Sequence, residues 1–239
     1  MHDTDTGIAA RLSAVDAGII ECRRCPRLVA YREAVARMKR RAYIDQVYWG
    51  RPVPGWGDPQ ARVWIVGLAP AAHGGNRTGR VFTGDRSGDF LYAALFRAGY
   101  ASQPESVSAA DGLQLRDVYI SAAVRCAPPD NKPTPAEFDA CRPYLVDELD
   151  ALAQVRVILA LGKIAFDSAL RVLAARGLLM PAPRPVFGHG AACTIGPYDV
   201  VASYHPSQRN TQTGLLTAQM MDEVLAQVSA AVATPRQTS

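Results

Sequence analysis

Four of the five cysteines are spaced so that their thiolates could bind one metal centre. Cys22 and Cys25 are separated by two residues, so one tight turn can bring both sulfurs to the same metal. Cys126 and Cys141 lie 15 positions apart, one after an apolar segment and one inside a predicted helix. Four soft ligands suit a 4Fe–4S cluster or a zinc ion, and the wide second pair favours the cluster because zinc ribbons usually repeat the close pair. Buried thiols without a ligand are the alternative, and Cys193 is predicted to be such a core thiol.

A second set of candidate residues follows four short apolar segments, at 63–68, 118–122, 157–161 and 200–204. The loops after them are 67–74, 125–129, 162–163 and 205–207. In an open α/β sheet the ligand binds outside the carboxyl ends of the strands. We therefore predict that these loops form the rim of an active site.

The elements that must position these loops alternate between apolar segments and helical stretches. Helices are expected at 87–98, 135–152, 163–175 and 214–232, and Thr134, Pro135 and Glu137 supply a capping box and first-turn proline for the second. The alternation predicts an α/β fold with a doubly wound, mainly parallel four-stranded central sheet flanked by helices. A hairpin from 193–195 into the last strand is also expected.

The N-terminal part has a different pattern. Helical periodicity at 8–20 and an arginine-rich stretch at 27–41 predict a helical appendage over about 8–41. A cluster on the four cysteines would tie this appendage to the sheet, so its expected role is mechanical, and Arg23, Arg24 and Arg27 would be available to face phosphate. We expect a single domain over 1–239 with a frayed tail at 233–239.

Composition sets broader limits. The formal net charge of +4 and the pI near 8.9 are compatible with a polyanionic partner without requiring one. No apolar run approaches the roughly 20 residues of a membrane helix, and the acidic start lacks the pattern of a signal peptide. We therefore expect a cytoplasmic protein that does not contact a membrane, with its cysteines reduced.

The loop at 67–85, which reads GLAPAAHGGNRTGRVFTGD, is far more specific than a bare glycine pattern. Together with His205-Pro206-Ser207 and the four cysteines, in the same order, it resembles the family-5 uracil-DNA glycosylases over residues from about 20 to 220. That family hydrolyses the bond between a damaged base and deoxyribose, on a nucleotide turned out of the helix. The resemblance implies DNA containing uracil as the partner and a 4Fe–4S cluster as the cofactor.

The resemblance also implies roles for individual residues. Phe82 would stack on the everted base. His205 would steady the negative charge that grows on the leaving base, and one such donor is typically worth roughly 3 to 4 kcal/mol. Asn76 would orient the attacking water, because Ala69 occupies the position nearest the strand, where well-studied relatives have a polar side chain. The residues expected to line the base pocket are Leu68, Ala69, His73, Phe82, Ser121 and Ala122.

One departure from the family pattern concerns base recognition. Related glycosylases read the base with an asparagine four residues before the third cysteine, and here that position is Ala122, preceded by Ser121. Without a side-chain amide, a broader range of deaminated bases, including hypoxanthine, becomes plausible. Asp85 remains a second candidate for the water, although a carboxylate just before a helix is usually a cap, and His73 could assist.

The remaining expectations concern DNA and assembly. Four residues are candidates for phosphate contacts: Lys163, Ser207, Arg209 and Asn210. No lysine other than Lys163 lies near the rim loops as a Schiff-base nucleophile, so we expect hydrolysis without a lyase step. We further expect a monomer that associates with the nucleoid during repair.

Two other functions compete with this interpretation. A zinc-stabilised protein that binds damaged DNA without catalysis is favoured by the alanines at positions 69 and 122, and release of free base would separate the two. An electron-transfer module would need a flavin or nicotinamide signature beside the cysteines, and the sequence offers none.

Overall fold

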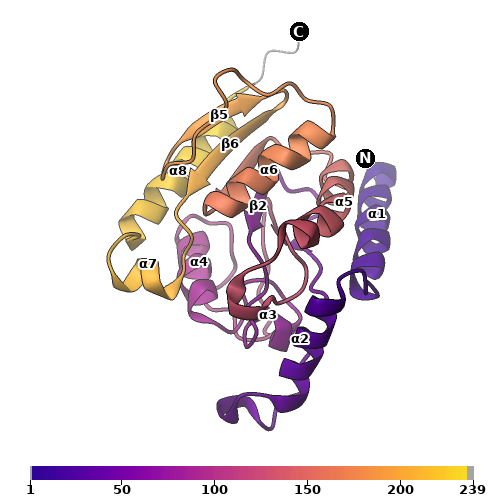
Figure 1. Cartoon of the computed structure of the whole chain (residues 1–239). Coiled ribbons are helices and arrows are strands. Elements are labelled where there is room, and N and C mark those ends of the chain that lie inside the picture. Colours follow the sequence, from indigo (N-terminus) through magenta and orange to yellow (C-terminus); the bar gives the residue numbers. More distant parts are fainter. Residues whose placement is uncertain (1, 236–239) are drawn as a thin grey trace.

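A mixed sheet of six strands, in the order β1-β3-β2-β4-β6-β5, lies at the centre of the fold (Figure 1). The structure is a computed structural model that describes residues 2–235, with side chains from residue 7 onward. The strands are β1 (Trp56–Gly57), β2 (Val63–Gly67), β3 (Val118–Ala122), β4 (Val157–Leu161), β5 (Ala192–Ile195) and β6 (Tyr198–Ser203). The four predicted strands are the inner ones, and they run parallel to one another.

The expected count of four strands was wrong, because an antiparallel strand extends the sheet at each edge. β1 pairs with β3 through only two residues, which is too short for any apolar alternation to reveal it. β5 pairs with β6 as the expected hairpin, with Cys193 opposite Val200. The chain turns at Gly196, whose φ of +55° favours glycine.

Helices cover both faces of the sheet, as a doubly wound fold requires. The helices of the described chain are α1 (His2–Ile20), α2 (Pro26–Met38), α3 (Gly75–Thr78), α4 (Arg86–Arg97), α5 (Pro135–Ala151), α6 (Lys163–Ala175), α7 (Gln208–Gln212) and α8 (Ala218–Ala233). Two short 3₁₀ turns, η1 (Arg41–Tyr43) and η2 (Pro129–Asn131), complete the set. None of the helices in residues 2–235 is long and apolar enough to cross a membrane.

Successive side chains of each strand point to opposite faces of the sheet and pack into two separate hydrophobic cores. Val63 and Ile65 of β2 pack with α4 and α8 on one face. Trp64 and Val66 pack with α5 and α6 on the other face, where α1 adds Leu12. Every residue of the three inner strands β2, β3 and β4 is buried, so these strands carry no solvent-facing polar alternation.

Local capping decides where several helices begin. Thr134 and Glu137 form the predicted capping box at the start of α5. The helix expected at 214–232 is α8, which begins at Ala218 because Thr217 caps it, and a short helix that was not expected, α7, precedes it with Ser207 as its cap. The helix expected to reach residue 41 ends at Met38, because Lys39 has a φ of +53°.

The N-terminal appendage is fastened to the body by ion pairs and packing. α1 lies along α5 (Figure 1). Arg27 forms a two-pronged ion pair with Glu137 of α5, and Arg24 lies over the ring of Tyr144 at 5.0 Å. These two arginines, expected to face phosphate, therefore contact the protein itself. At the other end of the chain, residues 236–239 of the expected frayed tail lie outside the described residues, and Ala233 is the last residue of α8.

Candidate active site

Phe82 and His205 face each other at the carboxyl ends of the parallel strands. Their ring centroids are 5.9 Å apart, with an angle of 33° between the ring planes. Phe82 comes from the loop after β2, and His205 follows β6. Each of the two residues keeps a partly exposed surface. The predicted rim therefore brings these two side chains together.

The backbone of Phe82 is held in a conformation that bulky residues rarely adopt. Its φ is +52°, in the left-handed region. A Cβ atom at Gly67 would lie 2.7 Å from two atoms of the Phe82 ring, and one at Gly88 would lie 1.8 Å from its carbonyl oxygen. Both glycines thus leave room for Phe82. Strain of this kind costs of order 1–3 kcal/mol and persists only where the surroundings enforce it.

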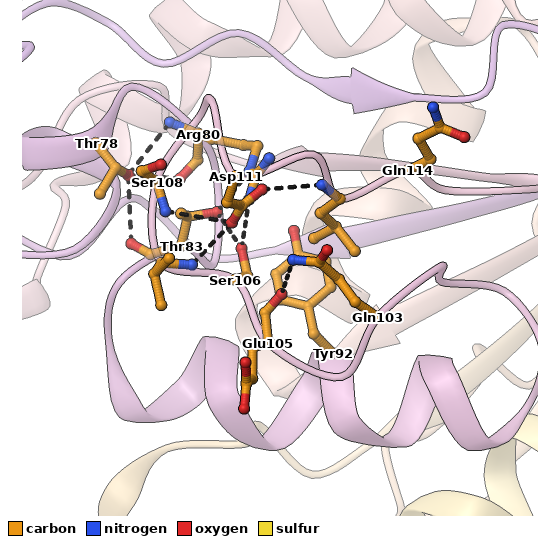
Figure 2. Close-up of polar contacts among 12 residues, drawn as sticks. Thr78, Arg80, Thr83, Tyr92, Gln103, Glu105, Ser106, Ser108, Asp111 and Gln114 are labelled. Atoms are coloured by element: carbon orange, nitrogen blue, oxygen red, sulfur yellow. Dashed lines mark hydrogen bonds and ion pairs between the residues drawn. The ribbon is translucent and has the colours of Figure 1, made fainter.

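A buried polar network behind Phe82 supplies that enforcement. Figure 2 shows Arg80, Thr83, Ser106 and Asp111 pointing toward one another. The Arg80 guanidinium donates to Asp111 at 2.6 Å, to Ser106 at 2.8 Å and, through Nε, to Thr83 at 2.9 Å. Arg80 and Asp111 are each 6% exposed in their side chains, so this is a buried ion pair.

The same network is tied to the strands by aromatic contacts. The Arg80 guanidinium lies 4.4 Å from the ring of Trp56, in edge strand β1. Trp56 donates to the Tyr92 hydroxyl, which donates in turn to the carbonyl of Val81. The segment 101–115 that carries Ser106 and Asp111 had no role in the sequence analysis, because its polar residues resemble those of an ordinary surface loop.

His205 is positioned through its backbone. Its carbonyl accepts hydrogen bonds from the backbone of Ser207 at 2.7 Å and from the Asn210 side chain at 2.9 Å. Gly162, with φ +95°, allows the close approach of the imidazole, since a Cβ there would lie 3.1 Å from that of His205. Among the described residues, no hydrogen bond is made by the ring itself.

The electrostatic environment keeps the His205 ring neutral. Burial lowers the pKa of His205 to about 4, because the imidazolium would lose hydration. At neutral pH the ring therefore carries one N–H that can be donated. A second histidine, His189, stacks on Tyr204 at 5.0 Å and accepts from its backbone amide. It fixes the residue before His205, and sequence reasoning missed it because it lies in the irregular segment before β5.

A cleft of about 1020 Å³ is lined by residues that follow Phe82 and His205 closely in the chain, among them Gly84 and Gln208, although the two rings themselves do not line it. One wall contains Gly84, Asp85 and Arg86, which directly follow the Phe82 loop. The segment after α2 contributes Arg40 and Tyr43, and other parts of the lining come from the 71–77 loop, α7 and the turn at Asp130. Both polar and apolar side chains line the cleft.

Asp85 lies in this cleft and also caps α4. Its Oδ1 accepts hydrogen bonds from the backbone of Ser87 and Gly88, both at 3.0 Å. The cap interpretation is therefore confirmed. The second oxygen, Oδ2, has no hydrogen-bond partner in the described chain and lies against Gly74, where a Cβ would be 2.0 Å from it. Burial raises the pKa of Asp85, while its two backbone donors oppose that shift.

His73 also lines the cleft, on the same loop. Its Nδ1 is 3.0 Å from the Tyr48 hydroxyl. Burial, together with the positive charges of Arg40 and Arg77, lowers the pKa of His73. Its neutral ring is held in place by Tyr48, a residue of the segment after α2.

Asn76 is fully buried in α3, with none of its surface exposed. Its Nδ2 donates to the carbonyls of Arg32 at 3.2 Å and Ala72 at 3.4 Å, and its Oδ1 has no partner in the described chain. It does not line the large cleft. The amide thus links the motif loop to α2, in addition to any role toward water.

The residues expected to surround the base divide between the two faces of the sheet. Ala122 belongs to the core against which Phe82 packs. The Ser121 hydroxyl accepts from Trp64 at 2.9 Å and donates to Glu148 at 2.7 Å, so it is directed to the opposite face. Leu68 and Ala69 are partly exposed after β2, and Ala69 also packs against the cysteine group described below.

The four residues predicted to bind DNA differ in availability. Ser207 caps α7, and Asn210 donates to the His205 carbonyl, so both support the loop internally. Arg209 is exposed on α7. Lys163 is exposed at the start of α6 and forms an ion pair with Asp167 at 2.6 Å.

The four predicted cysteine ligands converge beside the rim. Cys126 and Cys141 are buried and pack with Leu28 and Val124, and Cys25 packs against them. Burial raises the pKa of Cys126 to about 12 and that of Cys141 to about 11, and the charge of Cys22 also raises both. All of these cysteines are free thiols, as is Cys193. Within residues 2–235, no three histidine, cysteine or acidic side chains are arranged as a metal site.

One buried cation accompanies this cysteine group. Arg32 is 2% exposed and donates from Nη1 to the Cys126 sulfur at 2.9 Å and from Nη2 to the Cys22 carbonyl at 3.2 Å. Its Nε has no partner in the described chain. Sequence reasoning missed Arg32, because within an arginine-rich helix it cannot be distinguished from the surface arginines.

Comparison with known proteins agrees with this geometry. The family described as the uracil DNA glycosylase superfamily matches residues 54–229. The type-5 uracil-DNA glycosylase of Mycobacterium tuberculosis is 54% identical over 220 residues, which are 91% of this chain and 81% of that protein. The type-5 enzyme of Thermus thermophilus is 54% identical over 205 residues, 85% of this chain and 90% of its own. A type-4 uracil-DNA glycosylase of Pyrobaculum aerophilum is 35% identical over 130 residues, 54% of this chain.

Proposed function

Because this chain belongs to the uracil-DNA glycosylase superfamily, in its type-5 branch, we propose that it hydrolyses the N-glycosidic bond of uracil in DNA at the Phe82–His205 rim. The facing rings, 5.9 Å apart between centroids, carry this proposal. One ring offers a flat apolar surface and the other a neutral donor. These are the two features that an extruded pyrimidine needs.

Stacking on Phe82 holds the everted base. Uracil lies against the exposed part of the ring, and the buried Arg80–Asp111 pair prevents the loop from relaxing. Turning the nucleotide out of the duplex costs a few kcal/mol, and base–aromatic stacking returns roughly 1–3 kcal/mol of this. The fixed loop means that no further ordering is required when the base arrives.

His205 stabilises the leaving group as a neutral donor. As the bond between uracil N1 and the sugar C1′ breaks, its electron pair moves onto the base, mainly to the carbonyl oxygen beside N1. The N–H of His205 donates to that oxygen. Because the pKa of His205 is about 4, the imidazole is already neutral near pH 7 and need not release a proton before the reaction. The sugar carbon is left electron-poor and is attacked by water.

The water has two candidate partners. Asn76 can orient water through an amide oxygen but cannot accept its proton near pH 7. Its burial and its bonds to Arg32 and Ala72 favour a linking role. Asp85 lines the cleft and has Oδ2 free of other partners among the described residues, which favours it as the group that orients water and takes the proton after attack.

We also propose that other deaminated bases, hypoxanthine among them, are substrates. The base-facing position at the end of β3 is Ala122, and the adjacent Ser121 hydroxyl is engaged by Trp64 and Glu148 on the other face. Neither Ala122 nor Ser121 can therefore form the side-chain amide hydrogen bonds that would select one base. A pocket without such a reader discriminates among bases less sharply. Comparison of base release from uracil, hypoxanthine and xanthine duplexes tests this, and activity confined to uracil would refute it.

We propose a 4Fe–4S cluster as the cofactor, because four cysteines from distant parts of the chain lie near one another. Cys22, Cys25, Cys126 and Cys141 would hold it, and four thiolates are its usual donor set. The buried Arg32 donates one hydrogen bond to the Cys126 sulfur and has an N–H without a partner in the described chain, so it supplies the positive charge that such a group requires. The cluster would tie the appendage to the sheet and takes no part in bond cleavage. Iron and sulfide analysis of the purified protein, with zinc as the competing result, tests the assignment.

The decisive experiment is release of free uracil from an oligonucleotide that contains a single uracil. The wild type should leave an intact abasic strand that breaks only on alkaline treatment, since no lyase step is expected. His205→Ala should abolish most release. A protein that binds such DNA but releases no base would instead be a non-catalytic damage binder, the alternative with zinc in place of the cluster.

A further inference from the structure

A short segment after α2 combines exposed apolar and basic side chains. The segment 37–47, called here the arm, has Met38 exposed at 71%, Ile44 at 54% and Val47 at 92%. Large apolar side chains this exposed and this close in sequence cost hydration free energy unless a partner covers them. The arm therefore has the composition of a contact surface.

The cations of the arm identify the chemistry of its partner. Four of its residues are basic, namely Arg37, Lys39, Arg40 and Arg41, against one carboxylate, Asp45. None of the four forms an ion pair within the described part of the chain, whereas Arg23, Arg24 and Arg27 before them contact the protein. Lys39 donates to the Ile44 carbonyl at 2.9 Å, which folds the arm back on itself. Unpaired cations beside apolar side chains fit a polyanion with apolar interior surfaces, as nucleic acid has.

The arm is held rigidly against the motif loop. Arg77 of α3 lies 4.0 Å from the ring of Tyr43 and donates to the Gln46 side chain at 2.6 Å. The Trp49 amide donates to the Arg77 carbonyl at 2.9 Å. Arg77 is itself buried and donates to the backbone of His73 and Gly84, so the arm and the Phe82 loop share one anchor.

The position of the arm places it beside the base site. Arg40, Ala42, Tyr43 and Gln46 line the same cleft as Gly84 and Asp85. In Figure 1, α2 and the segment after it extend below the body of the molecule, past α3. A strand bound in the cleft would therefore contact the arm.

We propose that the arm is a second DNA-binding element, specific for duplex DNA, in which Met38, Ile44 and Val47 insert against the base pairs beside the lesion and the four cations hold the flanking phosphates. The inference rests on the proposed function. Apolar side chains that enter a groove unstack neighbouring base pairs, and this lowers the cost of turning a nucleotide out. A single strand needs no such opening, so the arm acts only where a complementary strand is present.

The test compares uracil release from the same oligonucleotide as a single strand and as a duplex, at constant ionic strength. The Met38→Ser, Ile44→Ser, Val47→Ser variant should lower kcat/KM about tenfold on the duplex and leave the single-strand value within about twofold, because opening one base step costs a few kcal/mol. The matched control is Val186→Ser with Leu179→Ser. These two side chains are 83% and 91% exposed in the α6–β5 connection, at the opposite end of the molecule (Figure 1).

A second experiment tests the charges of the arm. Arg37→Gln with Arg41→Gln should reduce the slope of log Kd against log salt for duplex DNA by about 2, one for each lost phosphate contact, whereas Arg184→Gln should not change it. Equal losses on single strand and duplex, or an unchanged duplex rate, would overturn the proposal, and the latter would indicate a protein partner instead. If the wild type released no uracil from either substrate, the proposed function itself would have failed.

Discussion

Phe82 and His205 lie face to face, with ring centroids 5.9 Å apart, although one follows the first parallel strand and the other the last. Sheet order explains the pairing. β4 lies between β2 and β6, and the loops that follow β2 and β6 meet across it. The small residue Gly162, at the end of β4, leaves room for this crossing.

Replacement of Phe82 by leucine should lower kcat/KM on uracil about 10- to 100-fold. Leucine keeps an apolar contact with Gly67 but offers no flat surface, and stacking on an aromatic ring is worth roughly 1–3 kcal/mol per base. The loss should appear mainly as weaker binding of substrate. Phe82→Tyr, which keeps the ring, is the control, and a leucine variant as active as the tyrosine variant would contradict the stacking role.

His205→Ala should lower kcat about 100- to 1000-fold, the cost of removing one donor to a developing oxyanion. The pH profile distinguishes a neutral from a charged donor. With a pKa of about 4, His205 stays neutral from pH 7 down to about 5, so its titration should not reduce the rate in that range. A rate that requires protonation of His205 would instead rise as the pH falls toward 4.

The same group affects stability with a defined sign. The unfolded histidine binds a proton near pH 6.5, whereas the folded one does so only near pH 4. Between these values the unfolded chain holds more protons, so the free energy of unfolding should fall as the pH falls from 6.5 to 4. The His205→Ala variant should show a shallower decline in denaturant titrations over that window.

Asp85→Asn separates the two candidates for the attacking water. Asparagine is also a good N-cap, so the start of α4 should be preserved and the melting temperature nearly unchanged. If the carboxylate orients water and accepts its proton, kcat should fall about 100-fold, and the acid limb of the profile that reflects the raised pKa of Asp85 should disappear. Asn76→Ala should mainly lower stability, by about 1–3 kcal/mol, through loss of its buried bonds. Reversal of these two results would return the role to Asn76.

The Arg80–Asp111 pair should control the Phe82 loop. Asp111→Asn leaves Arg80 buried without its counter-ion, and breaking one side of a buried pair costs about 3–5 kcal/mol. Calorimetry should show the loss of stability. With stacking impaired, the substrate KM should rise, whereas kcat at saturating uracil DNA should change little. Arg80→Met with Asp111→Asn, which removes both charges, should recover part of the stability.

Much of the fold was predictable because its signals are local. The inner strands at 118–122 and 157–161, and the helix at 163–175, have the expected bounds, since apolar runs and caps depend on neighbouring residues. The Thr134–Glu137 capping box forms as predicted for the same reason. The two edge strands escaped the count because β1 is only two residues long and is defined solely by its pairing with β3.

The sequence by itself determined which loops meet at the rim, because parallel strands bring their carboxyl ends to one edge and the motif residues follow those ends. Tertiary structure alone decided how each side chain is used. It buried Asn76, turned Ser121 toward Glu148 and placed Asp85 in the cleft. It also paired Asp111 with Arg80 and placed Arg32 on Cys126. These outcomes depend on contacts between segments far apart in the chain, where burial makes each polar group take whichever partner lies within reach.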